Sequence, residues 1–164
     1  MSDPTADPAN LQRAVRRLTD LEEIRELAHR YAHCVWQLDI SGAVDLFTED
    51  GIMDTGDRPP IVGRQDLLET YERMLGTAQF HPFVHSHVIE IDGDTATGTC
   101  YLDLRAAVEG KSMVGSGWYE DQYVRTAKGW KFKIRTLKMR YFVPLEDGWA
   151  DAETVALPPD PATA

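Results

Sequence analysis

Three of the chain's five histidines, His81, His85 and His87, fall within seven residues on one predicted strand. Side chains two residues apart on a strand share a face, so His85 and His87 could supply two metal ligands. A third ligand is missing, because Pro82 interrupts the strand after His81 and Glu90 has the opposite parity. We therefore expect no metal. A neutral imidazole also suits proton transfer, for which His81 and His85 are the candidates. The remaining alternative places His85 and His87 on the outer face of a sheet, against solvent or another subunit.

Aromatic and acidic residues on the first predicted helix could complete a site around such a base. Tyr31 is either a core aromatic residue or a phenol that donates a hydrogen bond to developing negative charge. Trp36 cannot exchange protons, so it either packs or stacks on a ring-shaped substrate. Asp39, at the end of this helix, is a further candidate for substrate contact.

The segment GSGWYEDQY carries a second group of candidates on one face of a predicted strand. Its alternating members are Gly117, Tyr119, Asp121 and Tyr123. The glycines allow close approach of a ligand or of another backbone, so Tyr119 and Tyr123 are predicted substrate contacts. The acids of this region could instead pair with Arg105 or Arg135 in a structural network.

Composition limits the class of protein. The chain has 164 residues, 43% of them hydrophobic and 27% charged, which is typical of one globular domain. A formal net charge of −10 argues against nucleic acid, which requires clustered Lys and Arg. The basic stretch from Lys128 to Arg140 is more typical of a solvated strand face, or it contains a residue that orients an anion.

Several absences narrow the function further. No run of apolar residues is long enough to span a membrane, and the N-terminus does not resemble a signal peptide. Cys34 and Cys100 form no paired motif, so we expect a reduced cytoplasmic protein. The sequence has no phosphate-binding glycine loop and no flavin or nicotinamide fingerprint, so we expect no cofactor.

Helices come first and strands last, which indicates an α+β fold. Residues 1–17 are predicted to be a flexible arm and 146–164 a tail, with a disordered end. A capping box formed by Thr19 and Glu22 predicts that the first helix begins there and runs to Leu38. Further helices are predicted at 43–47 and 64–75, and strands at 52–54, 61–62, 83–91, 95–108, 111–125 and 130–143. A change of parity near Arg135–Thr136 predicts a β-bulge.

Residues 18–145 resemble the SnoaL-like branch of the nuclear transport factor 2 superfamily. The resemblance rests on LEEIRELAHRYAHCVWQLDISGAVDLFTEDG, VIEIDGDTATGTCYL and GWYEDQYVRTAKGWKFKIRTLKMRYFVP. It implies a curved, cone-shaped sheet wrapped around N-terminal helices, with an apolar pocket inside. Members include scytalone dehydratase, bile-acid dehydratase, hexachlorocyclohexane dehydrochlorinase, polyketide cyclases, ketosteroid isomerase and proteins that only bind ligands.

The resemblance implies a cofactor-independent lyase or isomerase that acts on a small hydrophobic ring compound. Dehydratase-like members place a Tyr on the first helix, an Asp five residues later and a His before the third strand. Here the Tyr is kept as Tyr31, whereas Trp36 and Pro82 occupy the other two positions. His81 and His85 lie close to the family's His position and are the implied bases. The alternative is a non-catalytic protein that binds a small molecule.

The long strands carry apolar residues at both parities, such as Val84 and Val88 beside Phe83 and Ile89. A strand that is apolar on both faces is normally buried on both. Since the helices cover only one face, a homo-oligomer, either a dimer or a trimer, is expected to cover the other.

Overall fold

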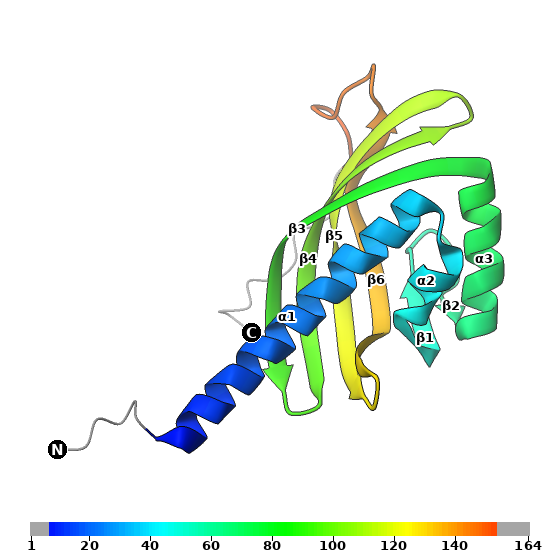
Figure 1. Cartoon of the computed structure of the whole chain (residues 1–164). Coiled ribbons are helices and arrows are strands. Elements are labelled where there is room, and N and C mark those ends of the chain that lie inside the picture. Colours follow the sequence, from blue (N-terminus) through cyan, green and yellow to red (C-terminus); the bar gives the residue numbers. More distant parts are fainter. Residues whose placement is uncertain (1–6, 154–164) are drawn as a thin grey trace.

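The computed structural model describes residues 7–153 and has the expected α+β architecture (Figure 1). The elements are, in chain order, α1 (Pro8–Gln37), α2 (Ile40–Asp45), β1 (Phe47–Asp54), β2 (Ile61–Val62), α3 (Arg64–Thr77), β3 (Ala78–Asp92), β4 (Thr95–Val108), β5 (Lys111–Thr126) and β6 (Gly129–Pro144). No helix in residues 7–153 is long and apolar enough to cross a membrane.

One curved, unclosed sheet of six strands forms the body, in the order β2-β1-β6-β5-β4-β3. β1 runs parallel to β6, and the other neighbours are antiparallel. Helix α1 crosses one face of this sheet, and α3 closes it near β1 and β2 (Figure 1). The core lies between these helices and the sheet, and includes Ile24, Leu67 and Phe132, whose side chains are fully buried.

Helix α1 begins earlier than the sequence indicated. Asp7 caps it by accepting a hydrogen bond from the Ala9 amide at 3.1 Å, and Pro8 suits the first helical turn. The prediction of a flexible arm is therefore wrong for residues 8–17, which are helical and exposed. Thr19 does not cap the helix, because its hydroxyl donates to the Val15 carbonyl within it.

Asp20 is the first residue of α1 that is buried against the body. Its carboxylate accepts hydrogen bonds from Arg125 and from the Trp130 indole, and Arg125 also binds Asp94 in the β3–β4 turn. The Arg125 hydrogen bond holds the pKa of Asp20 below its ordinary value. This ion-pair network fixes α1 to the end of the sheet where β3 turns into β4.

The strand irregularities differ from the predicted bulge at Arg135–Thr136. In the β5–β6 pairing, Tyr123 and Gln122 face Phe132 and Ile134, so Lys133 is the extra residue. A second shift, where Ser116 faces Tyr141 and Gly117 faces Met139, makes Arg140 the extra residue of β6. Arg135 is therefore regularly paired and points toward the core, with a fully buried side chain.

The other deviations are local. The second helix, predicted at 43–47, spans Ile40–Asp45 because Asp39 caps it by accepting from the Gly42 amide at 2.9 Å. After β6 the chain forms turns, and Trp149 stacks on Tyr141. The predicted disordered end of the tail lies outside the described residues.

Candidate functional site

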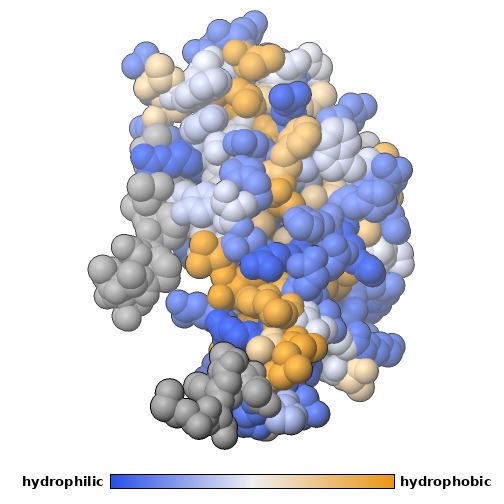
Figure 2. All heavy atoms as spheres, turned by 60° about the vertical axis from the view of Figure 1, so that its left-hand side comes forward, coloured by the Kyte–Doolittle hydropathy of each residue, from blue (hydrophilic) through white to orange (hydrophobic). Residues whose placement is uncertain are grey.

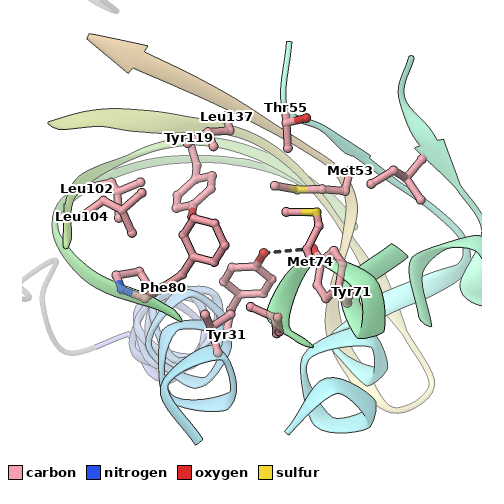
Figure 3. A pocket seen from close by; sticks show the side chains of 14 residues that line it. Tyr31, Met53, Thr55, Tyr71, Met74, Phe80, Leu102, Leu104, Tyr119 and Leu137 are labelled. Carbon is pink, nitrogen blue, oxygen red and sulfur yellow. Dashed lines mark hydrogen bonds between the residues drawn. The ribbon is translucent and has the colours of Figure 1, made fainter. Parts of the chain in front are cut away.

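An apolar cavity of about 100 Å³ lies between the sheet, α1 and α3 (Figure 3). Its lining residues are Tyr31, Val35, Met53, Thr55, Ile61, Tyr71, Met74, Leu75, Phe80, Pro82, Leu102, Leu104, Tyr119 and Leu137. An engineered cavity of about 150 Å³ is known to bind benzene, so this space suits a single ring.

Three phenols are the main polar groups at this cavity. The hydroxyls of Tyr31 and Tyr71 are 2.9 Å apart and share a hydrogen bond, and Tyr119 enters from β5 (Figure 3). Burial raises the pKa of all three tyrosines, so they stay protonated at neutral pH. Because one proton of the Tyr31–Tyr71 pair is used between them, one proton of this pair and that of Tyr119 can serve a ligand.

A buried cation lies behind these rings. The guanidinium of Arg135 is 3.6 Å from the centroid of the Tyr119 ring and 4.4 Å from that of Tyr31. Its Nε is 3.4 Å from Asp121 Oδ1, and none of its nitrogens makes a hydrogen bond to a described residue. A cation on the face of a phenol attracts its electrons. Arg135 therefore favours negative charge on the ligand side of these tyrosines.

Asp121 connects Arg135 to His87 through the Tyr123 hydroxyl. Tyr123 donates a hydrogen bond to Asp121 Oδ2 at 2.8 Å, and His87 Nε2 lies 2.9 Å from the same phenol oxygen. The Tyr123 proton points to Asp121, so His87 Nε2–H is the donor in the second bond. His87 Nδ1 is buried and has no partner among the described residues.

Burial moves these two pKa values in opposite directions. Desolvation raises the pKa of Asp121 to about 6, although Arg135 and the Tyr123 hydroxyl oppose it. Desolvation, with the nearby charge of Arg135, lowers the pKa of His87 to about 4. His87 is therefore a neutral imidazole at pH 7.

A bulge at Ser86 separates the histidines. Ser86 has a φ of 49°, and the pairing passes from His85–Tyr101 to His87–Cys100. Adjacent residues of β4 point to opposite faces, so the prediction that His85 and His87 share a face is wrong. His87 points inward. His85 is half-exposed on the outer face, 3.5 Å from Asp103.

Glycine at position 98 makes room for the inward histidine. A Cβ atom there would lie 3.1 Å from His87 Nε2 and 2.9 Å from the Val88 carbonyl oxygen. His87 and Tyr119 also belong to one row across the sheet, joined through Cys100. The contact between His87 and Tyr123 thus depends on the absence of a side chain at position 98.

The other predicted site residues lie in several different places. Tyr31 and Tyr119 line the cavity, and Tyr123 belongs to the network with Asp121. His81 and Trp36 lie outside it: Trp36 is 40% exposed, stacks on His81 at 4.0 Å and donates to the Pro82 carbonyl. Asp39 caps α2.

Sequence reasoning missed Tyr71, Phe80 and the inward orientation of His87. Tyr71 belonged to the predicted apolar stripe of α3, which gave no reason to separate it from the core. Within residues 7–153, no group of three or more His, Cys, Asp or Glu could hold a metal ion.

A family model described as a SnoaL-like domain matches residues 16–136. An uncharacterized protein of Mycobacterium tuberculosis is 27% identical over 136 residues, which cover 79% of this chain and 90% of the relative. A solved structure from Novosphingobium aromaticivorans, described as a candidate aromatic ring hydroxylase, is 26% identical, with a TM-score of 0.73 and coverage of 79% and 96%. Hexachlorocyclohexane dehydrochlorinase type 2 shares the fold at 18% identity and a TM-score of 0.76, with coverage of 80% and 93%.

Proposed function

We propose, given that this chain belongs to the SnoaL-like domain family, that it is a cofactor-independent lyase or isomerase. Its substrate in this proposal is a small hydrophobic ring compound that carries an oxygen atom. Elimination from the ring and relocation of a proton both fit. The cavity with its three protonated phenols is the observation that carries the proposal.

The proposed reaction follows from the groups that can stabilise negative charge in the cavity. Removal of a proton next to a ring carbonyl places negative charge on the oxygen, and phenol donors in a water-poor site stabilise that charge. Tyr119 and the Tyr31–Tyr71 pair are the proposed donors, and Arg135 supports them from behind the rings.

We assign proton abstraction to His87. It is neutral at pH 7, and its row in the sheet includes Tyr119 of the cavity. Proton transfer by a positioned imidazole typically contributes about 10²–10⁴-fold to a rate. His81 and His85, which the family resemblance favours, stay as predictions to be compared with His87 in the same assay.

A second function is favoured by a specific feature of the lining. Among the described residues that line the cavity, none is a carboxylate or an imidazole. A protein that binds the ring compound without converting it would need no carboxylate or imidazole in the cavity. The two functions differ in whether product forms.

The test uses ring ligands matched in size. Tyr119→Phe should weaken the binding of cyclohexanone about tenfold, because a hydrogen bond from a phenol is worth about 1–1.5 kcal/mol, and should leave the binding of methylcyclohexane unchanged. Trp36→Phe, outside the cavity, should change neither affinity. Calorimetry or thermal shift measures both.

An equal effect of Tyr119→Phe on the two ligands, or binding of neither ligand, would contradict the proposed site. A panel of single-ring ketones and phenols, followed by mass spectrometry for products, then separates enzyme from binder. Stabilisation without product across the whole panel would favour the binding protein.

A further inference from the structure

The first part of α1 extends beyond the body of the protein (Figure 1). All residues from 8 to 19 are exposed. Leu11, Val15 and Leu18, at helical spacing, form one apolar stripe, with 64%, 53% and 65% of each residue exposed. Figure 2 shows apolar side chains gathered at the lower end of this side of the molecule.

This extension, residues 8–19, has a charge opposite to that of the protein. It contains Arg13, Arg16 and Arg17 and no acidic residue, whereas the whole chain has a net charge of −10. The helical repeat of about 100° per residue places Arg16 and Arg17 about 130° from the centre of the apolar stripe, one on each side. A long arginine side chain can bend along the helix to reach a partner beside the stripe.

A groove of about 740 Å³ on the same protein has the complementary character. Asp50, Glu90 and Asp92 contribute acidic groups, and Ile91 and Val124 contribute apolar surface. Its cation, Lys133, is already in an ion pair with Asp50. This acidic groove therefore offers apolar contact together with unbalanced negative charge.

The extension and the acidic groove lie at the same end of the molecule. Arg125 binds both Asp20, where the extension leaves the body, and Asp94 in the β3–β4 turn. Asp92 and Thr95, on either side of that turn, line the acidic groove. The extension stays exposed, so it does not fill the groove of its own chain.

We propose that two copies of this chain form a two-fold dimer in which the extension of each copy occupies the acidic groove of the other. Both surfaces lie at one end of each protomer, so a two-fold axis at that end makes both contacts at once. The apolar stripe packs on the floor of the groove, and Arg16 and Arg17 pair with its acidic walls. An anionic membrane suits this extension less, because the rest of the chain is acidic.

A charge-swap experiment tests this dimer with the full chain. Light scattering on a size-exclusion column should give a dimer for the wild type at about 50 µM. Arg16→Glu/Arg17→Glu and Glu90→Lys/Asp92→Lys should each weaken dimerisation at least tenfold. The chain that carries all four changes should dimerise again, because the opposite charges then face each other.

Matched controls exclude general effects of charge. Glu72→Lys/Glu109→Lys makes the same change of net charge as Glu90→Lys/Asp92→Lys, at exposed positions away from the acidic groove, and should leave the dimer unchanged. Circular dichroism confirms that each variant is folded. A wild-type monomer, a dimer indifferent to both double variants, or failure of the fourfold variant to dimerise would overturn the proposal. So would a monomer that floats with phosphatidylserine vesicles in an Arg16- and Arg17-dependent manner.

Discussion

Arg135→Met is expected to lower the free energy of unfolding by about 3–5 kcal/mol at pH 7, the usual cost of removing one partner of a buried ion pair. Methionine retains apolar contact with the rings of Tyr31, Tyr119 and Phe132 that the guanidinium covers. What it removes is the cation beside Asp121, a carboxylate that is only 2% exposed. Urea denaturation followed by circular dichroism measures the loss.

The loss should depend on pH and on Asp121. The pKa of Asp121 is already raised to about 6 by burial, and loss of Arg135 removes a charge that lowers it. A group whose pKa is raised in the folded state stabilises the protein at low pH, and this contribution is lost as pH rises through the folded value. Arg135→Met should therefore cost less at pH 5 than at pH 7.

Two controls distinguish this explanation from simple loss of packing. Arg135→Met/Asp121→Asn should recover more than half of the loss, because no uncompensated charge is then buried. Arg105→Met removes an exposed arginine that also lies over an aromatic ring, Phe83, and should cost less than about 1 kcal/mol. If Arg135→Met cost no more than Arg105→Met, Arg135 would not be the partner on which Asp121 depends.

The sequence was sufficient for the class of fold because its patterns are local. The strand at 95–108 has the predicted bounds, and the turns on each side of it carry glycine, which allows positive φ. The length of α1 was not predictable in this way. Its extension has weak apolar periodicity. Thr19 and Glu22 match the capping-box pattern that is typical of a helix start, although they lie within a longer helix.

The site was harder to predict because its residues depend on register. Ser86 adopts a left-handed conformation, although it is neither glycine nor asparagine. The local sequence therefore did not indicate the bulge that turns His87 inward. Arg135 lay in a basic stretch that resembled a solvated strand face, and the shift at Lys133 directs it into the core. The pairing of Asp121 with Arg135 was one of the alternatives and is confirmed at 3.4 Å.

His87→Gln is the second change expected to have a large effect. If His87 is the base of the proposed reaction, turnover of an identified substrate should fall by about 10²–10⁴-fold at pH 7. Glutamine can still donate a hydrogen bond to Tyr123 but cannot accept the proton. The matched variant is His85→Gln, one bulge away on the outer face, which should leave turnover within about twofold of wild type.

The same variant should change how stability depends on pH. Burial lowers the pKa of His87 to about 4, from an ordinary value of 6.5. Between these values the unfolded chain binds a proton that the folded protein does not, so the wild type loses stability as pH falls from 6.5 toward 4. His87→Gln does not have this titrating group. Its stability relative to wild type should therefore rise by about 2 kcal/mol as the pH falls from 7 to 5.

Other titrating groups do not obscure this difference. Asp121 contributes with the opposite sign, since its pKa is raised, but it is present in both proteins and largely cancels in the comparison. Arg25 and His29 on α1 lie near enough to influence His87 and are likewise unchanged. Chemical denaturation of wild type, His85→Gln and His87→Gln at pH 5, 6 and 7 gives the three curves. Parallel curves for wild type and His87→Gln would mean that His87 is not held as a buried neutral imidazole, and its assignment as the base would then fail as well.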